Sequence, residues 1–149
     1  EFLEFEHCFE FRYSDFEFTI LFLTMDNNNI FNANSSPAVV KPWGEYIVLE
    51  QMENYWIKKI FVKKGARLSL QSHRGRSEVW VVLSGEVEAV QGDTRFVLNA
   101  GESITIEKNE KHRIAGLEDS WVLEAAFGEL SEDDIIRYED DYGRTQQTA

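Results

Sequence analysis

The chain has 149 residues, of which 43% are hydrophobic and 28% are charged, and its formal net charge is −12. This length and composition fit one folded domain with a buried core and exclude an intrinsically disordered protein. The acidic excess, without any basic stripe, argues against nucleic-acid binding, and every apolar run is too short to cross a membrane. The single cysteine, Cys8, cannot form an internal disulfide, which predicts a reducing compartment and a cytoplasmic protein.

Residues 1–24 differ in composition from the rest of the chain, because Phe and Glu dominate them. They lack the basic start and the small-residue cleavage site of a secretory signal. Our hypothesis is that Met25 is the natural start and that residues 1–24 are not native. The alternative is that their alternation of Phe and acidic residues forms an extra edge strand. Residues 25–40, rich in Asn and Ser, are interpreted as a loose leader.

Strand signals are dense from residue 41 onward. Nine short segments are rich in Val, Ile, Leu and aromatic residues and are separated by turn residues such as Gly92-Asp93. They span residues 45–50, 55–62, 67–73, 78–83, 86–91, 94–98, 103–106, 111–115 and 121–127. Many short strands at even spacing predict an all-β sandwich or barrel.

The last strand is followed by a short acidic stretch that begins at Ser131. Ser131 is a suitable N-cap, with Asp134 three residues later, and this pair predicts a short helical turn. The predicted organisation is therefore an atypical extension and leader over 1–40, one folded domain over 41–144, and a tail over 145–149.

Residues 65–85 are predicted to form a strand, a turn at 74–77 and a returning strand. Side chains at alternate positions of a strand share a face, so Gln71 and His73 point the same way. Glu78 opens the returning strand. If these faces line a barrel interior, an amide oxygen, an imidazole and a carboxylate converge there, and such a trio suits a divalent metal that needs one more strong ligand.

The histidine inventory points to that fourth ligand. The chain has three histidines, and apart from His7 they are His73 and His112, each in a strand-and-turn unit. Either histidine alone is most simply an ordinary polar residue of a β turn. Together with Gln71 and Glu78 they predict one metal site.

The spacing Gly-x5-Gln71-x-His73-x4-Glu78-x6-Gly over 65–85 resembles the first cupin motif, with Gln71 in place of a first histidine. Gly101 followed by His112 resembles the second motif. More specifically, K-P-W-G-E-Y, V-K-K-G-A-R-L-S-L-Q-S-H, E-V-W-V-V-L-S-G and E-D-D-I-I-R-Y-E-D-D-Y-G-R resemble type II mannose-6-phosphate isomerases. In that family the cupin is usually the C-terminal half of a bifunctional isomerase/guanylyltransferase. The resemblance implies a cupin double-stranded β-helix, or jelly-roll barrel, ending in a short helical turn.

The resemblance also implies the activity: a metal-dependent isomerase that interconverts mannose 6-phosphate and fructose 6-phosphate and feeds GDP-mannose and polysaccharide synthesis. It implies a sugar-phosphate ligand, a homodimer, and one divalent metal ion, Zn first, with Co, Mn, Fe or Ni also compatible. No Gly-rich nucleotide signature occurs, so guanylyltransferase activity is not expected. The alternatives are a stand-alone metal-binding cupin that binds a sugar without catalysis, and oxygen-dependent cleavage of a small diol at iron.

Phosphate recognition requires cations near the metal. Arg67 is predicted to share the inner face with the ligands, and the resemblance adds Arg76, Arg144 and Lys58. The general base is left open between Glu124, Lys58 and a metal-bound hydroxide, because both histidines outside the N-terminal extension are assigned to the metal.

Overall fold

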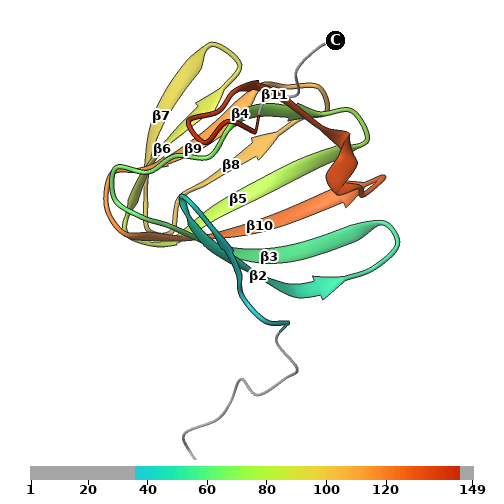
Figure 1. Ribbon diagram of the computed structural model, residues 1–149, viewed down its shortest axis with the longest axis horizontal. Helices are drawn as coiled ribbons and strands as arrows, with labels where there is room; N and C mark the ends of the chain where they lie inside the picture. Colours follow the sequence, from blue (N-terminus) through green and yellow to red (C-terminus); the bar gives the residue numbers. More distant parts are fainter. Residues whose placement is uncertain (1–35, 145–149) are drawn as a thin grey trace, which may run out of the picture. The chain divides into compact units, whose positions relative to one another are not determined.

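The computed structural model describes residues 36–144, so the hypotheses on residues 1–24 and on the tail at 145–149 lie outside the described part. The described chain forms eleven strands and one short 3-10 helix (Figure 1). In chain order these are β1 (Val39–Lys41), β2 (Gly44–Gln51), β3 (Tyr55–Val62), β4 (Leu70–His73), β5 (Arg76–Ser84), β6 (Glu86–Gln91), β7 (Thr94–Asn99), β8 (Ser103–Ile106), β9 (His112–Gly116), β10 (Ser120–Gly128), η1 (Glu132–Asp134) and β11 (Ile135–Glu139). No helix within residues 36–144 has the length and apolar character needed to cross a membrane.

The strands form two antiparallel sheets that face each other (Figure 1). One has the order β1-β2-β3-β10-β5-β8 and the other the order β11-β4-β9-β6-β7. Most strands that are consecutive in sequence lie in different sheets, as in a jelly roll. The predicted all-β double-sheet architecture is therefore confirmed.

The alternation of the long strands explains which face is buried. In β3 and β5 every second side chain is buried, as a strand with one face on a core requires. The inner face of this sheet is apolar over one half and charged over the other. The apolar half contains Ile60, Val62, Trp80, Val82 and Val122, and the charged half contains Lys58, Arg76, Glu78 and Glu124, all buried. Because ionisable side chains are seldom buried without partners, the charged half marks the candidate site.

The sequence prediction differs from the structure at two edges. Val39 and Val40, placed in the leader, pair with β2 as strand β1. The segment Ile135–Glu139, left without a strand, pairs with β4 as β11, with Ile135 opposite His73 and Arg137 opposite Gln71. The helical turn between β10 and β11 is confirmed as a 3-10 turn, in which Ser131 accepts a hydrogen bond from the Asp133 amide.

The β4–β5 turn is attached to the connection that follows β10. Gly75 donates its amide hydrogen to Asp134 Oδ2 at 2.8 Å, and its carbonyl accepts from the Glu129 amide at 3.0 Å. A Cβ at Gly75 would lie 2.7 Å from the Glu129 carbonyl oxygen. Glycine is therefore needed here for close packing of two backbones, and this packing fixes the turn between His73 and Arg76.

Candidate metal centre

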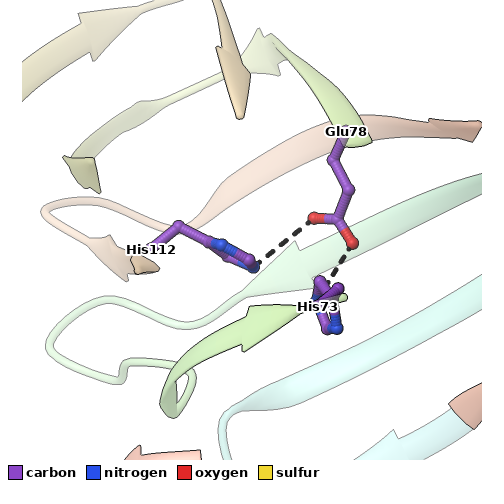
Figure 2. A group of neighbouring side chains, drawn as sticks. All are labelled: His73, Glu78 and His112. Carbon is purple, nitrogen blue, oxygen red and sulfur yellow. Dashed lines mark ion pairs between the residues drawn. The ribbon is translucent and has the colours of Figure 1, made fainter. Parts of the chain in front are cut away.

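Three buried side chains from both sheets meet inside the barrel (Figure 2). His73 ends β4, Glu78 lies in β5 and His112 begins β9, and each is at most 2% exposed. Their potential ligand atoms all lie within 4.8 Å of one another. The carboxylate of Glu78 lies between the two imidazoles, with Oε1 3.2 Å from His73 Nε2 and Oε2 3.7 Å from His112 Nε2.

The ring of His112 is oriented as a metal ligand would be. Its Nδ1 lies 2.8 Å from the Glu110 carbonyl oxygen, so Nδ1 carries the proton and donates it. Nε2 then presents a lone pair, but it is buried and has no hydrogen-bond partner among the described residues. Burial lowers the pKa of His112, which keeps that lone pair available. A buried acceptor without a partner, facing a carboxylate, fits a cation between them.

Glu78 is ionised at neutral pH. Burial alone would raise its pKa, but the hydrogen bond with His73 and nearby positive charge outweigh burial and lower the pKa to about 2. The permanent part of that positive charge is the guanidinium of Arg76. The donor set is thus two imidazoles and one carboxylate without thiolate, which suits a divalent ion of the Zn, Co, Mn, Fe or Ni group.

Gln71 lies beside this group but does not present its oxygen to it. The Gln71 Nε2 atom is 3.4 Å from His73 Nε2, and Oε1 accepts a hydrogen bond from Ser69 Oγ at 2.8 Å. Rotating the amide by 180° would exchange the two atoms and bring the oxygen towards His73. Its proposed role as the fourth ligand stays a prediction that depends on this rotation.

Arg76 contacts the same atoms that a metal ion would use. Its Nε donates to Glu78 Oε1 at 2.9 Å, and its Nη2 lies 3.0 Å from His73 Nε2. Nη1 donates to the Ser131 carbonyl at 2.9 Å, and the guanidinium lies over the Trp56 ring at 4.8 Å. Arg76 is 3% exposed, so it serves as the buried counter-cation of Glu78.

An open pocket adjoins the group, and Gln71 and Arg76, which both contact His73, are among its lining residues. His73, Glu78 and His112 are not among the residues that line this pocket. The group therefore lies behind the pocket wall that Gln71 and Arg76 form.

Glu124 on β10 lines the same pocket, and its register partner on the adjacent strand β3 is Lys58, which also lines the pocket. The Trp56 indole Nε1 donates to Glu124 Oε1 at 3.2 Å. Burial and, next, repulsion from Glu78 raise the pKa of Glu124 to about 7, although Lys58 and Arg76 oppose the shift. The pocket therefore contains a carboxyl group that exchanges a proton near neutral pH.

Residues 27–140 match the protein family described as "Mannose-6-phosphate isomerase C-terminal". The chain belongs to this family.

Several curated relatives share this mannose-6-phosphate isomerase C-terminal domain. The xanthan biosynthesis protein XanB of Xanthomonas campestris pv. campestris (strain B100) is 41% identical over 110 residues, which cover 72% of this chain and 24% of XanB. The alginate biosynthesis protein AlgA of Pseudomonas aeruginosa is 41% identical over 114 residues, 74% of this chain and 24% of AlgA. Mannose-1-phosphate guanylyltransferase 2 of Escherichia coli O157:H7 is 40% identical over 111 residues, 72% of this chain and 23% of the relative. The domain thus spans about a quarter of the length of these curated relatives.

Solved structures support the fold alone. An RmlC-like cupin from Shewanella frigidimarina superposes with a TM-score of 0.61 at 23% identity, covering 69% of this chain and 91% of that protein. Oxalate decarboxylase from Bacillus subtilis superposes with a TM-score of 0.59 at 18% identity, covering 68% of this chain and 30% of that protein. The predicted cupin fold of this isomerase-family domain is confirmed.

The residues predicted to bind phosphate lie in different surroundings. Arg67 differs from the prediction, because β4 begins only at Leu70 and Arg67 makes a bidentate pair with Asp141 at 2.7 and 2.8 Å on the surface, away from the pocket lining. Lys58 and Arg76 line the pocket, but their charges are paired inside the protein.

Arg144 also lines the pocket, where it is held by Asp140. Sequence reasoning missed two further lining cations, Lys41 and Arg137. Both lie in stretches that carry the family resemblance. The position of Arg137 at the pocket depends on the pairing of β11 with β4, which the sequence did not predict.

Replacing Arg76 with Gln is expected to destabilise the metal-free domain by about 3 kcal/mol, because Glu78 loses its buried counter-cation. Zn²⁺ should then raise the melting temperature more in this variant than in the wild type, since the ion no longer competes with the guanidinium for Glu78 and His73. Thermal unfolding with chelator and with Zn²⁺ measures both effects. The control is Arg74→Gln, an exposed arginine on the same turn. Equal Zn²⁺-induced increments in wild type and Arg76→Gln would contradict the competition.

Proposed function

We propose that this domain is a metal-dependent isomerase that interconverts mannose 6-phosphate and fructose 6-phosphate. The observation that carries the proposal is the buried His73, Glu78 and His112 group directly behind a pocket that contains a proton-exchanging carboxyl. Family membership supports the substrate class. Mannose 6-phosphate formed in the reverse direction would feed GDP-mannose synthesis, in keeping with relatives named for xanthan and alginate biosynthesis.

The proposed cofactor is one divalent metal ion, with Zn²⁺ as the first choice. His73, Glu78 and His112 would hold it, and Gln71 would join them after rotation of its amide. When bound, the ion would supply Lewis-acid stabilisation of the negative charge that develops on O1 and O2 of the sugar. Gln71 and Arg76 line the pocket and contact His73, so they mark the end of the pocket to which the O1/O2 end of the substrate would be bound.

Glu124 is the proposed general base. Because Trp56 Nε1 holds Oε1, we assign the transferred proton to Oε2. The carboxylate removes the proton from C2 of open-chain mannose 6-phosphate, and the resulting carboxylic acid returns it to C1. In the same conversion the O2 hydroxyl proton passes to O1, so that C1 becomes a CH2OH group and C2 the ketone. A pKa near 7 suits both halves of this transfer at neutral pH. Lys58, the other candidate, has its side-chain nitrogen 2.6 Å from Glu132 Oε1, so its hydrogen-bonding capacity is already used in that pair.

A second function has one observation in its favour. Arg76 already contacts Glu78 Oε1 and His73 Nε2 without any ion, which would suit a domain that binds a sugar phosphate and performs no chemistry. Both functions use the same pocket and the same anionic ligand, so turnover separates them.

The test is a coupled assay for fructose 6-phosphate formed from mannose 6-phosphate by the full chain, first stripped of metal and then loaded with Zn, Co, Mn, Fe or Ni. We expect turnover that depends on the added ion and disappears again with chelator. Stoichiometric metal without turnover for any ion would reject the isomerase and favour the binding function. Oxygen consumption with Fe²⁺ and a small diol would instead favour the oxidative chemistry of other cupins.

A further inference from the structure

Five cationic side chains line the pocket, in a protein whose net charge is −12. Three of them are neutralised by acids of the same chain. Lys58 pairs with Glu132 at 2.6 Å, Arg76 with Glu78 at 2.9 Å, and Arg144 with Asp140. Their charges are therefore largely neutralised by ion pairs within the protein even without a ligand.

The remaining two cations are Arg137 and Lys41. Among the described residues, no carboxylate oxygen lies within 4.0 Å of either side-chain charge, so neither forms an ion pair. The Nε of Arg137 is buried and has no hydrogen-bond partner in the described chain. Lys41 has its ammonium 5.8 Å from the centre of the Tyr46 ring, which leaves its hydrogen-bond donors open. A buried guanidinium N–H without an acceptor destabilises the folded state, and a ligand that accepts its hydrogen bond would remove this penalty.

The strand register places Arg137 towards the pocket. On β11 it stands opposite Gln71 of β4, and Ile135 stands opposite His73. Ser72, which lies between Gln71 and His73 on β4, points the other way, where its Oγ is 3.0 Å from the Tyr138 hydroxyl. Arg137 therefore lies on the same face of the sheet as the two predicted ligands of β4, but farther from the end where His73 lies.

Lys41 reaches the same pocket from the other sheet. It ends β1, opposite Gly44 of β2, at the edge of the six-stranded sheet, whereas β11 is the edge strand of the five-stranded sheet. The two uncommitted cations thus flank the pocket from two different sheets. Such a pair matches a dianion that lies between them.

Electrostatics supports an anion at this place. Burial and the neighbouring charge of Arg144 lower the pKa of Arg137, and the charges of Asp140 and Glu132 only partly oppose this shift. A further negative charge close to the guanidinium would favour its charged form. Glu124, which is paired in register with Lys58, would repel an anion placed beside it. A guanidinium also offers the forked donors that bind two phosphate oxygens at once.

We propose that Arg137 and Lys41 form the phosphate-binding end of the pocket and select phosphorylated over free sugars. This assignment rests on the proposed function, because it takes the ligand to be a sugar phosphate. With the phosphate between these two side chains, the sugar extends towards Gln71 and Arg76, and its reacting carbons come to Glu124. Arg67, on the surface with Asp141, has no part in it.

The test measures binding of inorganic phosphate, mannose 6-phosphate and mannose to the metal-loaded full chain by isothermal titration calorimetry. Arg137→Gln is expected to weaken phosphate and mannose 6-phosphate binding by about 10- to 100-fold, the usual effect of losing a charged hydrogen-bond donor, and to leave mannose binding unchanged. Lys41→Gln should act in the same direction, and the double variant should lose phosphate binding. Arg137→Lys keeps the charge without the fork and should fall between wild type and Arg137→Gln. Arg74→Gln, outside the pocket lining, is the matched control.

Isomerase turnover, measured in parallel, distinguishes failure of this assignment from failure of the proposed function. If Arg137→Gln and Lys41→Gln bind phosphate as tightly as the wild type, the assignment is overturned even when the enzyme turns over mannose 6-phosphate. If both variants lose phosphate binding and the wild type shows no turnover, the phosphate site stands and the isomerase is rejected. A wild-type protein that binds neither phosphate nor mannose 6-phosphate overturns the assignment. Circular dichroism and a thermal melt of each variant verify that the domain as a whole is still folded.

Discussion

His112→Ala is expected to abolish stoichiometric metal binding and, with it, isomerase turnover. The substitution removes a buried Nε2 lone pair that the Glu110 carbonyl orients and that no hydrogen bond in the described chain uses. Loss of an outer partner of a metal ligand typically costs about 10- to 100-fold in metal affinity or activity, and loss of the ligand itself should cost more. His73→Ala should have the same effect, because it leaves Glu78 with one imidazole.

The barrel should survive both substitutions, because each histidine is one member of a polar cluster and the apolar core lies elsewhere on the inner face. The measurement is metal content per chain after dialysis, together with a thermal melt. Ser72→Ala is the matched control: Ser72 stands between Gln71 and His73 on β4 but its hydroxyl meets Tyr138 on the opposite face. One metal ion per chain in both histidine variants would show that the ion binds elsewhere.

The strands with one buried face were predictable from sequence, and the reason is physical. A one-residue slip would exchange the core and solvent faces of a strand, so alternation is strongly imposed. The predicted segments 55–62, 86–91 and 103–106 coincide with β3, β6 and β8. The same alternation gave the correct side for Glu78 and Trp80, both buried on β5.

Edge strands and long-range ion pairs could not be predicted in this way. β1 has three residues, and β11 acquires its strand character from pairing with β4, more than sixty positions earlier in the chain at Ile135 and His73. Local pattern also extended the β4 strand back to Arg67, whereas Asp141 holds that guanidinium on the surface. Contacts between distant segments depend on the tertiary fold, and a local sequence pattern does not contain that information.

The candidate site was predictable at the level of residues but not of atoms. Alternation brought Gln71, His73 and Glu78 together, whereas His112 was linked to them by elimination and family resemblance. Its position follows from the pairing of Gln71 with His112 across β4 and β9. That Arg76 would contact the same carboxylate and imidazole, and that the Gln71 amide nitrogen would face His73, are consequences of side-chain packing inside the barrel.

Glu124→Gln is expected to lower kcat of the metal-loaded enzyme by about 10²- to 10⁴-fold, the usual contribution of a general base. The amide keeps the shape of the side chain and an oxygen that can accept from Trp56 Nε1, but it cannot carry the proton. In the wild type, turnover should decline as pH falls through the pKa of Glu124, because the base must be ionised to begin the reaction. Steady-state kinetics between pH 5 and 9 tests both statements.

The same substitution should stabilise the fold, and the sign follows from the direction of the pKa shift. The pKa of Glu124 is about 7 in the folded protein against 4.5 for the ordinary carboxyl, so the folded state binds the proton more tightly than the unfolded chain. Wild-type stability from this group is therefore highest below pH 4.5, falls between pH 4.5 and 7, and stays low above that. A difference of this size corresponds to roughly 3 kcal/mol at pH 8.

A glutamine at this position does not lower the stability of the fold at high pH, because it has no charged form. Metal-free Glu124→Gln should be more stable than wild type by about 1–3 kcal/mol at pH 8, since some of the gain is lost when Lys58 and Arg76 have one acid fewer nearby. At pH 5 the difference should nearly vanish. Urea unfolding at the two pH values with chelator present measures it, and Glu88→Gln, a partly exposed carboxyl of β6 paired with Arg95, is the control. A variant that is inactive and less stable at pH 8 would mean that Glu124 holds the charged half of the barrel together. One that is inactive and more stable would mean that the domain retains a destabilising buried carboxyl for its chemistry.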